Sequence, residues 1–580
     1  MCGITGFISF GQELPKELLQ TMNNALAHRG PDAEGFFYKE TLGLGHRRLS
    51  ILDLSEQANQ PMFSHNGRYV IVFNGEIYNF QEVAEKLHIQ MRTHSDTEVI
   101  LEAFAQKGVA CVQLFNGMFA FAIYDTQENE LYLFRDRIGK KPLYYFWNGQ
   151  YFAFASELKA LQHLPFIKKD LNEKAIRSFL HLGYIPRPDT IYEHISKMYS
   201  GYWLKVTKDG IEENLYWDIQ SVIKPEKNKV EEVEATEQLK TLLQSSVKYR
   251  LISDVPLGIF LSGGIDSSLV AAIAQEQSTQ KIKTFSIGFE EEKYNEAPFA
   301  RKVAQALNTE HYEHIISIDE AKKLVPELIG IYDEPYADSS AVPTLLVSEF
   351  AKKQVSVVLG GDGGDELFLG YGMYQWAKRL QQPFWRAFRK PMAMLLALRG
   401  EHISFKKAAS LFNYPSHALA SHIFSQEQFF FSQKELDKLL LSSYEHTEIL
   451  HSCYEDARCD PMQQQALFDL QYYLQDDLMV KVDRATMHYG LEARSPFLDY
   501  RLIEFALNLP TELKYKDKES KYLLKKILYQ YLPKNLFERP KRGFSIPLAD
   551  WLSKDLKFMI DEYLNESVVK KHQIVRYEEV

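Results

Sequence analysis

Two different patterns of apolar residues divide the chain near residue 218, and one sheet cannot accommodate both. Before that point, aromatic and β-branched runs are broken by hairpin signals such as His-Asn-Gly at 65–67 and Trp-Asn-Gly at 147–149. After it, short apolar runs alternate with helical patterns. The intervening residues are rich in Lys, Glu, Pro and Asn, as in an exposed linker. We therefore predict domains at 2–217 and 235–580, joined by a linker at 218–234.

The two halves belong to different fold classes. In the first, helical patterns at 17–27 and 96–106 interrupt the sheet-forming runs, which predicts an α+β domain. In the second, expected strands at 256–261, 281–289 and 356–359 are each followed by a helix, which indicates a mostly parallel sheet. Residues 404–532 are mainly helical in pattern, so this α/β domain should carry a helical C-terminal portion.

Charge and cysteine content exclude several classes of function. A formal net charge of -10 and an isoelectric point near 6.0 argue against a surface dedicated to nucleic acid or anionic lipid. The four cysteines, Cys2, Cys111, Cys453 and Cys459, form no CxxC pair and no metal-ligand spacing, so we expect a reducing, cytoplasmic setting. Apolar runs fall far short of the roughly 20 residues that span a bilayer, and no membrane partner is expected.

Cys2 follows the initiator methionine directly. If Met1 is removed, one residue carries both a thiol and a free α-amine, whose reference pKa of about 7.7 lets it accept the thiol proton near neutrality. Such a cysteine activates itself. By itself, a cysteine near a start codon is more often a small apolar residue in an edge strand, so the rest of the domain must decide.

Five motifs follow one another in the first hundred residues: MCGITGF, HRGPD at 28–32, RLSI at 48–51, NGEIYN at 74–79 and SDTE at 95–98. In this order they resemble the class II glutamine amidotransferases. That family consists of N-terminal-nucleophile (Ntn) hydrolases. The resemblance implies an αββα sandwich for this domain and Cys2 as the catalytic nucleophile.

The resemblance also implies how glutamine is held. The guanidinium of Arg48 would bind its α-carboxylate through two parallel hydrogen bonds, and Asp96 would bind its α-amino group. The side chain of Asn74 and the backbone N–H of Gly75 would form the oxyanion hole, with Glu76 in the same binding loop. Taken singly, Asn74-Gly75 is also typical of a hairpin turn and Asp96 of a helix N-cap.

A second group of motifs lies in the α/β half. The segment SGGIDSS at 262–268 follows an apolar strand and opens a helix. Two glycines allow close backbone approach, while backbone N–H groups, serine hydroxyls and the helix dipole favour a phosphate. The segment lacks the Gly-Lys-Ser/Thr ending of a Walker A loop and instead resembles the pyrophosphate loop of ATP pyrophosphatases. The predicted loop contacts to ATP are Ser262, Gly263, Gly264, Asp266 and Ser267.

A companion segment, LGGDGGDE at 359–366, also follows an expected strand. If the two loops face each other at the carboxyl edge of the sheet, Asp266 and Asp365 offer hard oxygen ligands to a Mg²⁺ that bridges the ATP phosphates. Asp362 would lie near the new acyl-adenylate and take part in catalysis. The similarity also implies further ATP-binding residues, namely Phe260, Ile287, Gly360, Gly361, Arg484 and Lys541.

The pairing of these domains resembles the asparagine synthetase (glutamine-hydrolysing) family. Similar glutaminase domains are also joined to sugar-isomerising or phosphoribosyl-transferring domains, but SGGIDSS favours the ATP pyrophosphatase partner. The resemblance implies that Cys2 releases ammonia from glutamine, that ATP adenylates a carboxylate, and that ammonia displaces AMP. Aspartate is the expected acceptor. The expected partners are these small molecules, and a homodimer is compatible with the sequence.

Two departures leave other acceptors open. Asparagine synthetases usually have Glu where this chain has Asp362, and residues 332–350, expected near the acceptor, contain no Arg or Lys. A uronic acid in surface polysaccharide assembly or a natural-product precursor is therefore an alternative acceptor. A non-catalytic descendant is a third hypothesis, but the intact nucleophile, glutamine-binding and acidic residues count against it.

Overall fold

The first half of the chain forms two antiparallel sheets of six strands each. The computed structural model describes residues 2–225, 230–290, 295–398, 403–413, 419–442, 458–538, 546 and 548–580. The first sheet has the order β10-β8-β9-β1-β3-β2 and the second β12-β11-β7-β6-β5-β4. The strands of the first are β1 Gly3–Ser9, β2 Ala33–Lys39, β3 Leu42–Arg48, β8 Tyr144–Trp147, β9 Tyr151–Ala155 and β10 Ile195–Lys197. Those of the second are β4 Met62–Phe63, β5 Tyr69–Ile77, β6 Gly117–Asp125, β7 Glu130–Arg135, β11 Tyr202–Thr207 and β12 Gly210–Leu215.

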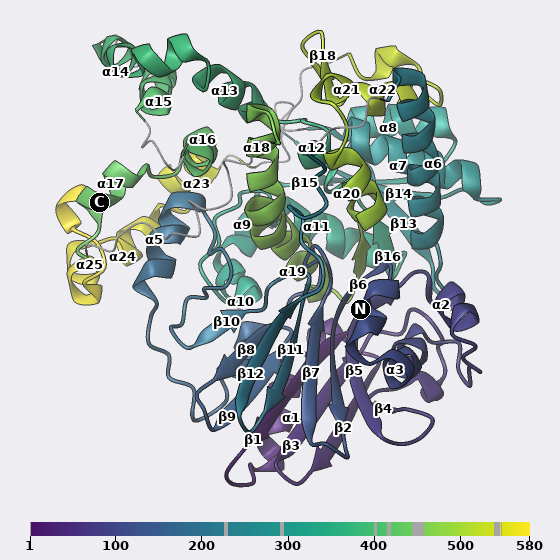
Figure 1. The fold of residues 1–580 in the computed structure, drawn as a ribbon. Coiled ribbons are helices and arrows are strands. Elements are labelled where there is room, and N and C mark those ends of the chain that lie inside the picture. Colours follow the sequence, from purple (N-terminus) through teal and green to yellow (C-terminus); the bar gives the residue numbers. More distant parts are fainter. Residues whose placement is uncertain are drawn as a thin grey trace.

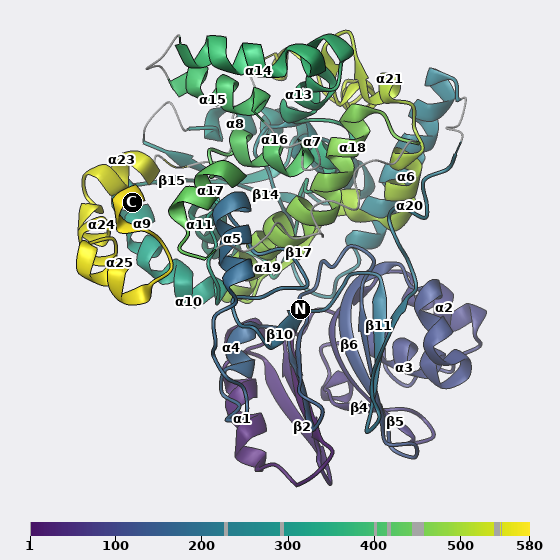
Figure 2. The ribbon, with the colours of Figure 1, turned by 60° about the vertical axis from the view of Figure 1, so that its left-hand side comes forward.

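These sheets stack face to face with helices on both outer sides (Figure 2). Side chains such as Ile4, Leu44, Val72 and Leu133 fill the space between the sheets. On the outside, α1 (Lys16–Asn24) packs on the first sheet, and α2 (Phe80–Lys86) and α3 (Asp96–Lys107) pack on the second. The layers are therefore α, β, β, α, which confirms the predicted α+β sandwich.

A parallel sheet of five strands, ordered β15-β14-β13-β16-β17, forms the centre of the second half (Figure 1). Because β13 pairs with β16, with Ile259 opposite Leu359, the loops after these strands leave the sheet at the same edge. The strands are β13 Leu257–Phe260, β14 Lys283–Phe289, β15 Glu310–Ile316, β16 Val357–Leu359 and β17 Glu492–Arg494.

Helices surround this sheet and continue beyond it, as the sequence predicts for an α/β domain with a helical C-terminal portion. The helices that bear on the site are α6 Glu232–Arg250, α7 Ile265–Gln277, α8 Ala297–Leu307, α11 Ala341–Lys352, α12 Gly364–Leu367, α18 Pro461–Phe468, the π-helix η6 Asp469–Leu478, α19 Met479–His488, α20 Tyr500–Leu507 and α22 Tyr522–Leu528. The others in this half include α13 Met373–Leu380, α14 Pro383–Leu398, α15 Ile403–Phe412, α16 Leu419–Glu427, α17 Gln433–Leu439, α24 Lys557–Tyr563 and α25 Glu566–His572.

Within the segment predicted to be mainly helical, 404–532, the structure contains the short strand β17, which the sequence did not predict. Its three residues, Glu-Ala-Arg, are too few to show a strand period in the sequence, and pairing with β16 makes them a strand. Strand β15 was not predicted either.

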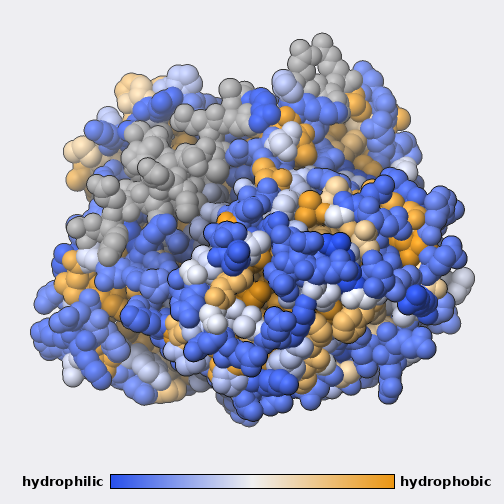
Figure 3. Space-filling view, turned by 60° about the horizontal axis from the view of Figure 1, so that its bottom comes forward, coloured by the Kyte–Doolittle hydropathy of each residue, from blue (hydrophilic) through white to orange (hydrophobic). Residues whose placement is uncertain are grey.

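The face that the first half presents is mostly hydrophilic, with apolar side chains scattered among polar ones (Figure 3). Among the described residues, no helix has the length and apolarity needed to cross a bilayer.

Candidate active site

Cys2 lies immediately before β1, and both its main chain and its side chain are enclosed. Its backbone N–H donates to Asn74 Oδ1 at 3.0 Å, and its Sγ lies 4.0 Å from the carbonyl oxygen of Leu49. Burial raises the pKa of the Cys2 thiol, because a thiolate is poorly solvated there. The thiol therefore needs an adjacent base to become nucleophilic, and the α-amine exposed by removal of Met1 is suited to that task.

Asn74 and Gly75 lie within β5, beside the nucleophile. A Cβ atom added to Gly75 would lie 2.1 Å from the carbonyl oxygen of Met118, so the close approach of β6 requires glycine here. Asn74 uses Oδ1 to accept from Cys2, and its buried Nδ2 has no hydrogen-bond partner within the described part of the chain. An unsatisfied donor beside the thiol fits an oxyanion hole. The hairpin-turn alternative for Asn74-Gly75 is wrong, because both residues pair with β6.

Arg48, Glu76 and Asp96 line the same small cavity as Cys2 and Gly75. The Nη1 atom of Arg48 donates to the carbonyl oxygen of Ser55 at 2.8 Å and to Asn59 Oδ1 at 2.6 Å. No carboxylate lies within ion-pair distance of this guanidinium in the described ranges, so its charge is available to a substrate carboxylate.

Asp96 is the first residue of α3, and the N-cap is Ser95, which corrects the N-cap alternative. Asp96 Oδ2 accepts from the backbone N–H of Ile77 at 2.8 Å. Burial raises the pKa of Asp96 and that of Glu76, so an ammonium group entering the cavity would favour their ionised forms.

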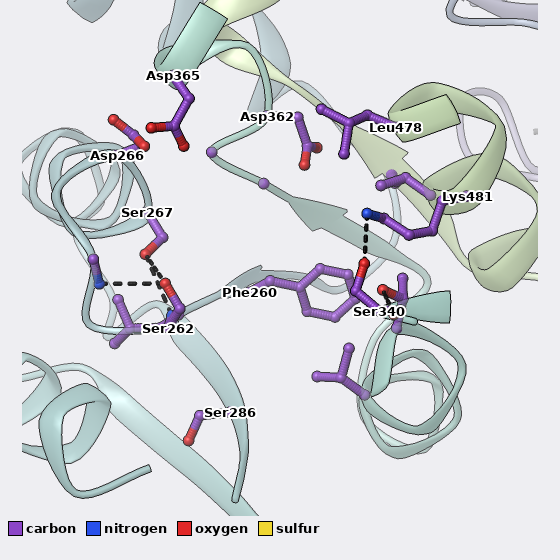
Figure 4. Close-up of a pocket in the computed structure, with 18 of the residues that line it drawn as sticks. Phe260, Ser262, Asp266, Ser267, Ser286, Ser340, Asp362, Asp365, Leu478 and Lys481 are labelled. Carbon is purple, nitrogen blue, oxygen red and sulfur yellow. Dashed lines mark hydrogen bonds between the residues drawn. The ribbon is translucent and has the colours of Figure 1, made fainter. Parts of the chain in front are cut away.

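A second cavity, of about 310 Å³, lies at the carboxyl edge of the parallel sheet (Figure 4). Both predicted loops contribute to its wall, together with α11 and the start of α19. Among the predicted site residues, the structure brings the following to this cavity: Phe260, Ser262, Gly264, Asp266, Ser267, Ile287, Gly360, Gly361, Asp362 and Asp365.

The first loop is held by its own serines. Ser262 Oγ lies 3.0 Å from Ser267 Oγ and accepts from the backbone N–H of Gly264 at 3.2 Å. Gly263 does not line the cavity. Its φ of +71° and the backbone of α8, 2.8 Å from a Cβ placed there, leave room only for glycine. The loop ends at the N-terminus of α7, whose dipole favours an anion.

Asp266 and Asp365 face each other, as the sequence predicts for neighbouring loops (Figure 4). The Lys521 ammonium, at the N-terminus of α22, bridges them: it contacts Asp266 closely and lies 2.7 Å from Asp365 Oδ1. The described residues contain no cluster of three or more His, Cys, Asp or Glu residues that could hold a metal alone. Two carboxylates nevertheless fit Mg²⁺, which commonly takes one or two carboxylates and completes its shell with phosphate and water.

Comparison with protein families identifies both halves. The glutamine amidotransferase domain family matches residues 1–217, and the asparagine synthase family matches residues 238–580, more than half of the chain. The chain belongs to the asparagine synthase family. It is a glutamine-dependent amidotransferase of the asparagine synthetase type, as the order of its motifs predicted.

Relatives of this asparagine synthase family member cover nearly its whole length. Asparagine synthetase [glutamine-hydrolyzing] 1 of Bacillus subtilis is 33% identical over 580 residues, which cover 98% of this chain and 90% of that protein. A protein of Methanocaldococcus jannaschii is 38% identical over 517 residues, covering 84% of this chain and 98% of its own. Amidase chry2 of Gibberella zeae is 28% identical, covering 98% and 92% respectively.

Two predicted ATP-binding residues remain to be placed, Arg484 and Lys541. Lys541 lies outside the described residues. Arg484 is buried away from the cavity, because glutaminase residues take up its charge: its Nη1 lies 2.7 Å from Glu157 Oε1 and its Nη2 donates to Tyr144 at 3.3 Å. The structure therefore gives Arg484 a place between the two halves rather than beside phosphate.

Three basic residues that sequence reasoning missed bear on the sites. Arg29 is fully buried and donates through Nε to the carbonyl oxygen of Cys2 at 3.1 Å. Lys521 neutralises the acidic pair, and Lys481 lines the cavity at the carboxyl edge of the parallel sheet. The HRGPD motif could have identified Arg29, whereas a lone lysine in a helical stretch is usually a solvated surface charge and carries no such signal.

Proposed function

We propose that the protein converts L-aspartate into L-asparagine, with ammonia from glutamine and with ATP split to AMP and pyrophosphate. The observation that carries this proposal is Lys481. Among the described residues that line the 310 Å³ cavity, it alone is positively charged, and it lies on the same side as Asp362 (Figure 4). Aspartate brings a second carboxylate into the cavity, and that carboxylate needs such a cation.

Lys481 is held ready for this role. Its Nζ donates to Asp338 Oδ2 at 2.6 Å and to Ser340 Oγ at 2.7 Å. An ammonium group has three donor hydrogens, so one remains for a ligand. Burial disfavours the charge, but Asp338 and Asp477 outweigh it and raise the pKa of Lys481, which keeps the side chain positive at neutral pH.

In the glutaminase cavity, the Cys2 thiol passes its proton to the α-amine and attacks the amide carbon of glutamine. Asn74 Nδ2 and the Gly75 N–H stabilise the oxyanion, while Arg48 and Asp96 hold the two ends of the amino acid. Breaking the C–N bond releases ammonia, and water then hydrolyses the thioester to glutamate. The ammonia must reach the second cavity without meeting bulk water, where it would become ammonium.

In the synthetase cavity, the serines and backbone N–H groups of residues 262–267 hold the phosphates. The acceptor carboxylate attacks the α-phosphorus of ATP and displaces pyrophosphate. Asp266 and Asp365 are the residues that would hold Mg²⁺, which supplies charge neutralisation to the phosphates. Lys521 adds a cation at the same place. Ammonia then attacks the acyl-adenylate near Asp362, and AMP leaves.

The test is product analysis with purified enzyme, ATP, magnesium and saturating aspartate, using glutamine or ammonium as the nitrogen source. We expect asparagine, AMP and pyrophosphate in equal amounts. Formation of ADP and phosphate would contradict adenylation. If no asparagine forms, other carboxylic acids, including uronic acids, should be screened for AMP formation, and an acid that gives AMP takes the place of aspartate.

Lys481→Met should raise the KM for aspartate about tenfold or more, because one charged hydrogen bond to the substrate is lost. The KM for ATP and the glutaminase rate should stay close to those of the wild type. Lys353→Met, an exposed lysine at the end of α11, is the matched control and should change neither. An unchanged KM for aspartate in Lys481→Met would contradict the proposal that Lys481 binds the acceptor.

A further inference from the structure

A short chain of hydrogen bonds crosses from the glutaminase half to Asp362. Lys140, in the loop after β7, donates through Nζ to Ser495 Oγ at 3.1 Å. Ser495 follows β17 and donates through the same oxygen to Asp362 Oδ2 at 3.0 Å. The ammonium donates to the hydroxyl, and the hydroxyl donates to the carboxylate. Lys140 of the first half is therefore connected to Asp362, a predicted catalytic residue of the second half, through the single hydroxyl group of Ser495.

Several hydrogen bonds hold the loop that carries Lys140. The Asp136 carboxylate accepts the backbone N–H groups of Ile138, Lys140 and Lys141, each at 3.0 Å. It also accepts from the backbone of Phe119 at 3.1 Å, which ties the loop to β6. The position of the Lys140 side chain is therefore set by the glutaminase fold.

Burying the charged side chain of Lys140 costs free energy. Its side chain is almost completely buried, and no carboxylate lies within ion-pair distance of it in the described portion of the chain. Burial lowers the pKa of Lys140, and Asp362 is the foremost of the acids that oppose this effect. An apolar side chain of similar size would avoid the desolvation cost, so the lysine needs a function to explain it.

The residues around Lys140 lie where the two halves of the chain meet. Lys140 and Ser495 both border a small cavity of about 20 Å³ that Tyr78 and Met118 also line. Met118 is the residue whose carbonyl oxygen packs against Gly75 of the glutaminase cavity. The contact to Asp362 is therefore made next to the strand that forms the oxyanion hole.

We propose that Lys140, acting through Ser495, is a positioning residue that orients Asp362 for amidation. Because Lys140 belongs to the glutaminase domain, this orientation depends on the docking of that domain against the second half. The inference rests on the proposed synthetase function for the role of Asp362. An aspartate reaches one methylene less far than the glutamate usual in asparagine synthetases. A fixed hydroxyl donor, itself fixed by a buried cation, holds the shorter carboxylate in one orientation.

The experiment compares Lys140→Met, Ser495→Ala and Ser495→Thr in ammonium-dependent amide formation. Loss of a hydrogen bond in a charged network should lower kcat about tenfold in the first two variants, with little change in the KM for ATP. Ser495→Thr keeps the hydroxyl and should restore most of the rate.

Controls separate this role from simple packing. Lys168→Met, an exposed lysine of the same half, should leave the rate unchanged. The double variant Lys140→Met/Ser495→Ala should lose no more than either single variant, because both break one chain of bonds. If the losses multiply, the proposal is overturned.

A second measurement needs no acceptor and keeps this inference separate from the choice of aspartate. The shifts in thermal unfolding midpoint caused by Lys140→Met and Asp362→Asn should be non-additive, since the two groups share Ser495. Additive shifts would overturn the connection. If wild-type enzyme makes no asparagine, the acceptor assignment fails, and the kinetic comparison is made with the acid that supports AMP formation.

Discussion

Residues of the glutaminase cavity combine burial with hydrogen-bond capacity that the protein leaves for a substrate. Asn74 keeps a buried Nδ2 donor without a partner in the described ranges, and Arg48 is bound by carbonyl and amide oxygens only. Both conditions cost free energy without a substrate, because buried donors and charges lose their hydration. Their combination beside Cys2 is what a site for a zwitterionic amide requires.

Cys2→Ala should abolish glutamine hydrolysis, with a loss on the order of 10⁴-fold or more, because the nucleophile is gone. Amide formation from added ammonium should continue, since the ATP cavity lies in the other half. The measurements are glutamate release and ammonium-dependent AMP formation. Cys111→Ala, which removes a buried thiol of the same half, is the control and should keep both activities. Loss of both activities in well-folded Cys2→Ala would contradict the separation of the two sites.

Secondary-structure elements place these residues by bringing distant segments together at their ends. The loops that follow β13 and β16 are about a hundred residues apart in sequence, and they meet because their strands are parallel neighbours. In the first half, β5 carries Asn74 and Gly75 past β6 at a distance that only a glycine allows. A strand that pairs on both sides cannot move to make room for a side chain without disturbing its neighbours.

Gly75→Ala should lower the glutaminase rate by about a hundredfold or more, because the added methyl group displaces the backbone N–H of the oxyanion hole. It should also destabilise the first half by about 1–3 kcal/mol, the cost of overpacking. Glutamate release and thermal unfolding measure the two effects. In Gly330→Ala, the added methyl group has open space around it, so the glutaminase rate should stay unchanged and the stability should not fall. A wild-type rate in Gly75→Ala would contradict the prediction, because β6 would then have moved to make room for the methyl group.

On the scale of the whole molecule, buried ion pairs join the two halves. Arg29 of the first half donates to Asp483 Oδ2 of α19 at 2.8 Å while it holds the carbonyl oxygen of Cys2. Asn116 donates to Asp499 Oδ2 at 3.0 Å. Cys2 therefore contacts Arg29, whose acidic partner Asp483 belongs to the other half.

Acid should weaken this junction. Burial opposes ionisation of Asp499, yet hydrogen bonds from Arg501 and the charge of Arg250 lower its pKa to about 2. Because the folded-state pKa is below the ordinary value of 3.8, Asp499 stabilises the fold above pH 4 and this contribution, about 2 kcal/mol, is lost as the pH falls toward 2. In Asp499→Asn, the unfolding midpoint should fall less between pH 4 and pH 2 than in the wild type.

Asp517→Asn, an exposed acid of the same half, should follow the wild-type curve through this range. An equal pH dependence in Asp499→Asn and in the wild type would show that other carboxylates dominate the acid response.

The sequence alone determined the amidotransferase family and the fold class, because both are encoded in short-range patterns. A nucleophile at residue 2, a glycine-rich loop between strand and helix, and the period of apolar residues all depend on neighbours in the chain. Only the tertiary structure decided which basic residues lie at the sites and between them. Lys481, Lys521 and Lys140 individually carry no functional signal in the sequence, and their partners lie far away along the chain. Arg484 shows the converse, since the family resemblance suggested phosphate whereas Glu157, a buried acid of the other half, lies against its guanidinium. Which carboxylate a buried cation meets depends on how two folded halves dock, and no local pattern encodes that.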